Sequence, residues 1–128
     1  MPESAKLQPI PLKVYRSTDR LTVAAPMAGM EPQDIRVEIT DDGRLLLDGE
    51  VRGVLKDVKI LLVDEWSVGA YYRDFRLPEA VDGSQATATY GNGVLVVTFP
   101  LSEKNIPARL TLSSTGLARG MSDNIALP

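Results

Sequence analysis

The chain has 128 residues, of which 44% are hydrophobic, and a formal net charge of −3. It has no cysteine and no histidine, which excludes disulfides, thiolate nucleophiles, Ser-His catalysis and zinc sites built on these residues. Its 14 Lys and Arg are scattered among 17 Asp and Glu, so nucleic acid is not an expected partner. No apolar run approaches the roughly 18 residues of a membrane-spanning helix. The start does not resemble a secretory signal, and a cytoplasmic location is expected.

The first residues predict an arm followed by two short strands. Residues 1–13 contain three prolines and few apolar anchors, so we expect a short, mostly unstructured arm. Val14 and Tyr15 predict a brief strand. The alternation from Leu21 to Ala25 predicts a second strand, which Pro26 ends.

The stretch 34–40 has the clearest alternation in the sequence. Ile35, Val37 and Ile39 face one way and charged residues face the other, which predicts a strand with one buried and one wet face. A strand over 44–48 follows. Asp41 and Asp42 could suggest a cation site, but the glycine after them favours a turn.

Residues 50–68 have two interpretations. Val58, Ile60 and Leu62 alternate as in a strand, yet Leu55, Val58 and Leu62 also fit helical spacing, and so short a run does not decide between them. Trp66 beside this run favours interface packing over a ligand platform. Residues 71–76 then predict a strand, in which Arg73 is expected to reach a carboxylate across the sheet.

The stretch 86–100 predicts a β-hairpin. Its two halves have strand composition, and Asn92 and Gly93 between them accept the positive φ angles of a primed turn. After Pro100 the chain turns polar, and a short strand-like run follows at 109–113. We therefore divide the chain into an arm (1–13), one domain (14–100) and a C-terminal extension (101–128). Seven or eight short strands predict an all-β fold, an antiparallel β-sandwich.

Four motifs in order make the chain similar to a known domain. Ala88–Leu95 fits A-x-x-x-N-G-V-L, and Gly69–Pro78 resembles G-x-F-x-R-x-F-x-L-P with tyrosine at the first aromatic position. Pro26–Ile35 is similar to L-P-G-v-x-x-x-D-I with one extra residue, and Leu45–Glu50 fits L-x-I-x-G-E. Across 14–100 the chain thus resembles the immunoglobulin-like α-crystallin domain of the small heat shock proteins, bacterial type.

The resemblance implies an ATP-independent holdase, which binds partly unfolded proteins and suppresses their aggregation. It implies no catalytic residue, no metal and no cofactor, and the sequence has no phosphate-binding G-x-x-x-x-G-K-[ST] loop. An alternative is a co-chaperone adaptor of the p23 type. That class lacks both the long loop at 50–68 and a motif at 110–112, which speaks against it. An enzyme has little support.

The resemblance also implies three interaction sites. The loop 50–68 would pair with the early edge strand of a second copy, which protects that edge in a homodimer; the residues are Val14, Tyr15, Val58, Ile60, Leu62 and Trp66. A groove for a tail or a client would be lined by Ile35, Val37, Ile39, Ala86, Ala88 and Tyr90.

The third site is a C-terminal motif that docks into this groove on a neighbouring subunit by strand addition. Leu110 and Leu112 fit it best, and Ile125 and Leu127 come second. An ordinary last strand of the same sandwich is an equal alternative for the first pair. Because the arm is short, we expect small assemblies, down to dimers.

Overall fold

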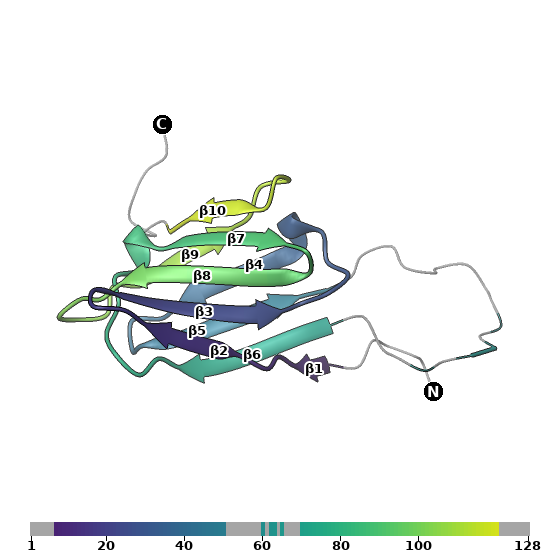
Figure 1. Cartoon of the computed structure of the whole chain (residues 1–128), viewed down its shortest axis with the longest axis horizontal. Coiled ribbons are helices and arrows are strands. Elements are labelled where there is room, and N and C mark those ends of the chain that lie inside the picture. Colours follow the sequence, from purple (N-terminus) through teal and green to yellow (C-terminus); the bar gives the residue numbers. More distant parts are fainter. Residues whose placement is uncertain (1–6, 51–59, 61, 64, 66–69, 121–128) are drawn as a thin grey trace.

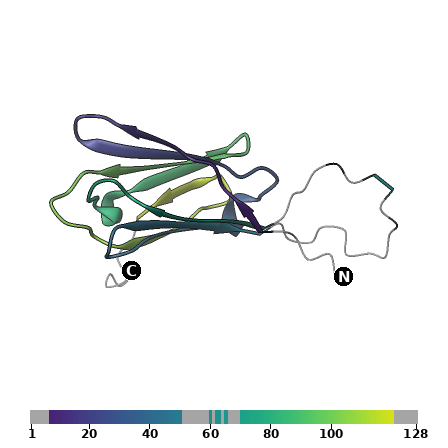
Figure 2. The ribbon, with the colours of Figure 1, turned by 90° about the horizontal axis from the view of Figure 1, so that it is seen from below.

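The structure is a computed structural model that describes residues 7–50, 60, 62, 63, 65 and 70–120. Its described strands form two five-stranded sheets that pack face to face (Figures 1 and 2). The first sheet contains, in spatial order, β1 (Leu7–Pro9), β6 (Ala70–Arg76), β5 (Arg44–Gly49), β4 (Ile35–Ile39) and β9 (Ala108–Thr111). The second contains β10 (Leu117–Arg119), β7 (Thr87–Gly91), β8 (Val94–Pro100), β3 (Arg20–Pro26) and β2 (Lys13–Arg16). The predicted all-β sandwich is confirmed.

Two 3₁₀ turns, η1 (Pro32–Asp34) and η2 (Gly83–Gln85), precede β4 and β7. The pairing of β1 with β6 is parallel, and the other described strand pairs are antiparallel. Within the described residues there is no helix of the length and apolarity needed to cross a membrane.

The core lies between the sheets because alternate side chains of each strand point inward. In β4 the buried positions are the three that the alternation predicted, Ile35, Val37 and Ile39. Across the interior they face side chains of β3 and β8, among which Leu95, Val97 and Phe99 are fully buried. Burial of this kind stabilises the fold by about 1.5–3 kcal/mol for each large apolar side chain.

The hairpin of β7 and β8 has the turn that its sequence predicted. Gly91 pairs with Val94, so the loop contains two residues. These are Asn92 and Gly93, whose φ angles are 54° and 78°. Positive φ at both positions gives a type I′ turn, whose twist matches that of the strands.

The N-terminal part differs from the predicted unstructured arm of residues 1–13. From Leu7 the chain forms β1 along the edge of the first sheet, and β2 follows at the edge of the second. Between the two strands Ile10 is fully buried in the core. Its burial explains why this proline-rich stretch has a fixed place: the crossing from one sheet to the other closes one side of the sandwich.

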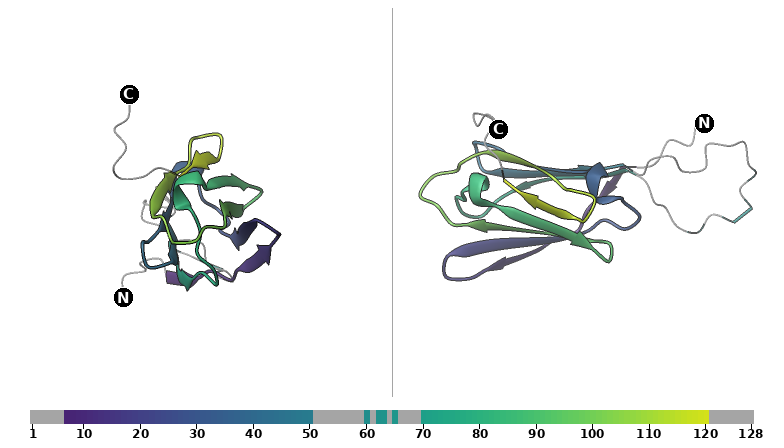
Figure 3. Two further views of the ribbon diagram at one scale, coloured as in Figure 1. Left: turned by 90° about the vertical axis from the view of Figure 1, so that its left-hand side faces the viewer. Right: turned by 90° about the horizontal axis from the view of Figure 1, so that it is seen from above.

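The C-terminal part closes the opposite side. β9 pairs with β4 and is an edge strand of the first sheet, whereas β10 pairs with β7 and is an edge strand of the second (Figures 1 and 3). A turn at Ser113–Gly116 joins them, with hydrogen bonds from Gly116 N to Ser113 O (2.8 Å) and from Ser113 N to Leu117 O (2.9 Å). The boundary predicted at Pro100 is therefore not a boundary of the fold. We call residues 108–120 the C-terminal hairpin, a hairpin whose two strands belong to different sheets.

Candidate functional site

The six residues predicted to line a groove come from β4 and from residues 86–90, beside the edge strands β9 and β10. The structure brings all six together in or against one buried cluster, and we use the name β4–β7 groove for this filled region. Five of them are at most 2% exposed and Tyr90 is half-buried; the six are Ile35, Val37, Ile39, Ala86, Ala88 and Tyr90.

β9 lies along β4 and adds to the burial of these residues, which also pack against the opposite sheet. Val37 pairs with Leu110, and Ile39 pairs with Ala108. Leu110 and Leu112 are each 1% exposed and belong to the same core cluster as the groove residues. Apolar side chains at alternate positions of β9 thus fill the groove as an added strand does.

The second strand of the hairpin covers the other wall of the groove. Ala118 pairs with Ala88 and packs against the core. Leu117 points outward and is 57% exposed. The groove is therefore covered from β4 to β7 by residues of its own chain.

This placement differs from the predicted docking of Leu110 and Leu112 on a neighbouring subunit. In the single chain Leu110 lies in β9, a strand of the same sandwich, as in the alternative, although β10 follows β9; Leu112 lies one residue beyond its end and is also buried. Docking on a neighbour stays a prediction for this pair. The second pair, Ile125 and Leu127, lies outside the described residues.

The predicted dimer surface is described in part. On β2, Val14 is half-buried and Tyr15 is 53% exposed, and the described strands pair with β2 on one side alone. In the loop, Ile60 is 86% exposed and Leu62 is 87% exposed. Val58 and Trp66 lie outside the described residues, so the choice between strand and helix stays open there.

Within the part of the chain that the structure describes, the contacts of Arg73 are with a main-chain oxygen and an aromatic ring and not with the predicted carboxylate. Its Nη1 donates to the carbonyl oxygen of Ile10 at 2.7 Å, and its guanidinium lies 5.5 Å from the ring centre of Phe75. The partner is a main-chain atom 63 residues away, which fixes the crossing between β1 and β2. No pattern in the sequence identifies such a contact.

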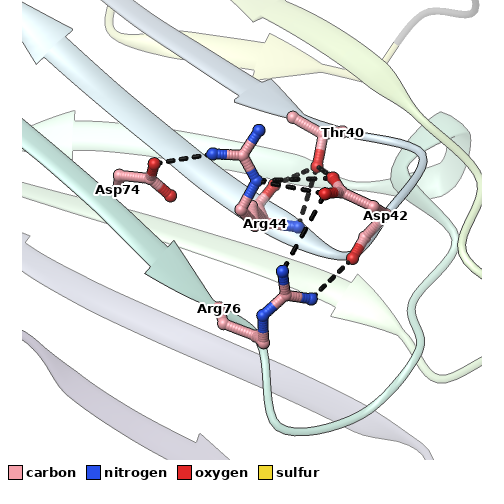
Figure 4. Close-up of polar contacts among 5 residues, drawn as sticks. All are labelled: Thr40, Asp42, Arg44, Asp74 and Arg76. Carbon is pink, nitrogen blue, oxygen red and sulfur yellow. Dashed lines mark hydrogen bonds and ion pairs between the residues drawn. The ribbon is translucent and has the colours of Figure 1, made fainter.

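Asp42 belongs to a turn and an ion-pair network (Figure 4). Its carboxylate binds Arg44 at 3.3 Å and lies 3.9 Å from Arg76, while Arg44 also binds Asp74 at 2.7 Å. The hydrogen bond from Thr40, and then the hydrogen bond and the charge of Arg44, lower the pKa of Asp42. Within the described residues no group of three acidic side chains could hold a metal ion. The turn interpretation of Asp41–Gly43 therefore fits this structure.

Two glycines of the C-terminal hairpin have a structural role that the sequence patterns did not identify. Gly116 has a φ of 84°, and any Cβ there would collide with the carbonyl oxygen of Tyr90. A Cβ on Gly120 would collide with the carbonyl oxygen of Gly83. The run Ser113–Gly116 between two apolar stretches is a turn signal that could have predicted the hairpin.

Comparisons with known proteins agree with this architecture. Residues 13–110 match the Hsp20/alpha crystallin family. The chain is 43% identical over 86 residues to the 17.6 kDa class I heat shock protein 1 of Arabidopsis thaliana, covering 63% of this chain and 53% of that protein. It is 33% identical over 104 residues to spore protein SP21 of Stigmatella aurantiaca, covering 81% and 62%. It therefore spans less than two thirds of the length of these relatives.

A solved structure, heat shock protein 16.0 from Schizosaccharomyces pombe, superposes with a TM-score of 0.63 at 26% identity, covering 77% of this chain and 71% of that one. The family match covers most of the chain, including both walls of the β4–β7 groove. The chain belongs to the Hsp20/alpha crystallin family.

Proposed function

We propose that the chain is an ATP-independent holdase chaperone. It binds partly unfolded proteins and keeps them from aggregating, and it does so without catalysis. Family membership supports a chaperone role of this kind.

The observation that carries the proposal is an extended apolar segment that pairs with the edge of β4 and packs among the six residues predicted for the groove. β9 extends the first sheet beside β4 with Ala108 and Leu110 buried at alternate positions, and Leu112, one residue beyond its end, is buried as well. A partly unfolded protein offers the same kind of segment, with an unpaired backbone and exposed apolar side chains. Strand addition supplies main-chain hydrogen bonds that do not depend on sequence, so many different clients fit one groove.

The proposed active form is a homodimer. β2 is an edge strand that presents Tyr15, and Ile60 and Leu62 are large apolar side chains with nearly full exposure. Exposed apolar side chains that are grouped in one short loop, as these two are, favour an interaction site over a solvated surface. We propose that the loop of each chain covers β2 of its partner.

The test is an aggregation assay with a heat-labile client protein in the absence of ATP. We expect light scattering to fall as the chain is added, and to approach zero at a molar excess. An equal mass of serum albumin is the control for non-specific protection. Unchanged scattering at excess would overturn the holdase proposal.

A further inference from the structure

The two sheets differ in the charge of their strands. The strands of the first sheet contain five basic and three acidic residues. Those of the second sheet contain four basic residues and no acidic residue. Of these four, Arg16 is paired with Glu79, while Lys13, Arg20 and Arg119 are exposed. The second sheet is therefore locally positive in a chain whose net charge is −3.

The middle of the outer face of the second sheet has no charged side chain. Alternate residues of β3, β7 and β8 point away from the core, and they are mostly threonine, valine and alanine. The Oγ1 atoms of Thr22 and Thr98 lie 3.3 Å apart in a hydrogen bond, so these hydroxyls are directed at each other. On the first sheet, by contrast, each of β4, β5 and β6 has charged residues at its outward positions. We call the surface on the second sheet the uncharged face; it consists of Thr22, Ala24, Thr87, Thr89, Val94, Val96 and Thr98.

An exposed apolar side chain and a cation lie at each of the two edges of the uncharged face. On β2 they are Tyr15 and Lys13, and on β10 they are Leu117 and Arg119. The register places all four on the outer side of the sheet. Four strand spacings, about 19 Å, separate the two edges. The turn between β2 and β3 contains one acid, Asp19, at one end of the sheet.

The edge at β10 is fixed to the sandwich. Tyr90 N donates to Gly116 O at 2.8 Å, and Gly120 N donates to Ala86 O at 2.7 Å. Both ends of β10 are therefore hydrogen-bonded beside β7, and the outward side chains of β10 are held on the face.

The edge at β2 remains on this face in the proposed homodimer. A strand that a second copy adds to β2 lies in the plane of the sheet. Tyr15 and Lys13 point out of that plane, because their register partners Thr22 and Ala24 do so. The added strand would thus extend the face and leave it open.

From these features we propose that the uncharged face and its two edges bind the surface of a bilayer that contains anionic lipids. Lys13, Arg20 and Arg119 contact the anionic headgroups. The exposed apolar side chains at the two edges enter the boundary between headgroups and acyl chains. The contact is peripheral and needs no spanning segment.

The chemistry of the face favours a lipid surface over a protein partner. Its side chains are small, and the hydroxyls of Thr22 and Thr98 already bond to each other. The cations are long and flexible and lie around the face, which suits a fluid anionic surface better than a partner with fixed hydrogen-bonding groups. The proposal does not depend on the holdase function.

Flotation with lipid vesicles tests the proposal. The vesicles contain phosphatidylcholine and phosphatidylserine in equal amounts, and pure phosphatidylcholine vesicles are the comparison. We expect the wild-type chain to float with the mixed vesicles at low ionic strength, and to be released as salt is added. Because the net charge is −3, such binding requires a local positive surface. Failure to float with the mixed vesicles would overturn the proposal, and an acidic protein would then be the better partner for this face.

Charge reversal identifies the surface. Lys13→Glu plus Arg119→Glu changes both edges of the uncharged face. Arg36→Glu plus Arg109→Glu is the matched control, because it changes the net charge equally and both residues are exposed on the first sheet. We expect the first pair to weaken vesicle binding at least about tenfold, with a much smaller loss in the control. Equal losses in the two variants would overturn the assignment to this face.

A dye attached to a single thiol gives a second readout. The chain has no cysteine, so Leu117→Cys and Thr111→Cys each provide one attachment point, on the second and the first sheet. With a polarity-sensitive dye, we expect a blue shift at position 117 when the mixed vesicles are added, and none at position 111. A shift at position 111, or none at position 117, would overturn the proposal. No client protein takes part, so a failed aggregation assay would not affect this result.

Discussion

Tyr71 and Tyr90 come from opposite sheets and donate hydrogen bonds to neighbouring carbonyl oxygens of one loop. Tyr71 Oη donates to Ala28 O at 2.9 Å, and Tyr90 Oη donates to Met27 O at 2.6 Å. Tyr90 Oη also accepts from Met30 N at 3.3 Å. The loop between β3 and η1 is therefore fixed to both layers of the sandwich at the end of the β4–β7 groove.

The Tyr71 contact predicts a loss of stability at alkaline pH. Burial, and then the nearby Tyr90, raise the pKa of Tyr71 above its ordinary value of 10.0. The folded chain therefore holds this proton more tightly than the unfolded chain does. Its contribution is complete below the unfolded pKa and is lost as pH rises through the folded pKa.

Tyr71→Phe removes the pH dependence that the Tyr71 hydroxyl gives to the folding stability. At neutral pH we expect it to cost about 1 kcal/mol, because the Ala28 carbonyl loses its donor. Above pH 10 the difference from wild type should shrink. Urea unfolding at pH 7 and pH 11 measures both effects, with Tyr72→Phe as the control because Tyr72 is 41% exposed. A constant difference across this range would contradict the prediction.

Gly116→Ala is expected to detach the C-terminal hairpin from β7. Gly93→Ala is the matched control: both glycines have φ near 80°, so alanine is strained by about 1–2 kcal/mol at either site. A Cβ at Gly93 meets nothing closer than 3.5 Å, whereas at Gly116 it collides with Tyr90 O. Hydrogen exchange at Tyr90 N should therefore accelerate in Gly116→Ala and stay slow in Gly93→Ala. Equal exchange rates would mean that the collision is relieved without detachment.

Leu110→Ala plus Leu112→Ala is expected to destabilise the chain without changing its native mass. Both side chains are 1% exposed in the core, and each truncation costs about 2–5 kcal/mol by urea unfolding. Leu117→Ala in the same hairpin should cost less than about 0.5 kcal/mol, because Leu117 is exposed. Native mass spectrometry gives the second readout. A shift to smaller assemblies in the double variant would indicate that these leucines dock on a neighbouring chain.

The strands that the sequence predicts are those with two distinct faces. The alternation over residues 34–40 identifies β4 and its buried side, and the glycines and asparagine at 91–93 identify the turn between β7 and β8. These features are local, since they depend on side-chain period and on φ. Local signals were thus sufficient for the sandwich and for the strands β4, β7 and β8.

The remaining elements depend on contacts between distant residues. β1 and β10 have three residues each, too few for an alternation to be read. Leu110 and Leu112 form a visible strand pattern, but the pattern does not say on which chain's β4 the strand lies. Their position depends on the bonded connection at 101–107, whose partners are main-chain atoms elsewhere in the fold.

Ile60→Asp plus Leu62→Asp is expected to convert the proposed homodimer to monomers. The two side chains are 86% and 87% exposed in the single chain, so the substitutions cost little folding stability. In the dimer they would bury two unpaired carboxylates against the partner's β2, a cost of several kcal/mol. Val63→Asp is the matched control, because Val63 is also 69% exposed, whereas the proposed strand register puts Ile60 and Leu62 on one face and Val63 on the other. Light scattering after gel filtration should give half the wild-type mass for the double variant and the wild-type mass for the control. If all three chains have the same mass, these side chains do not form the dimer interface.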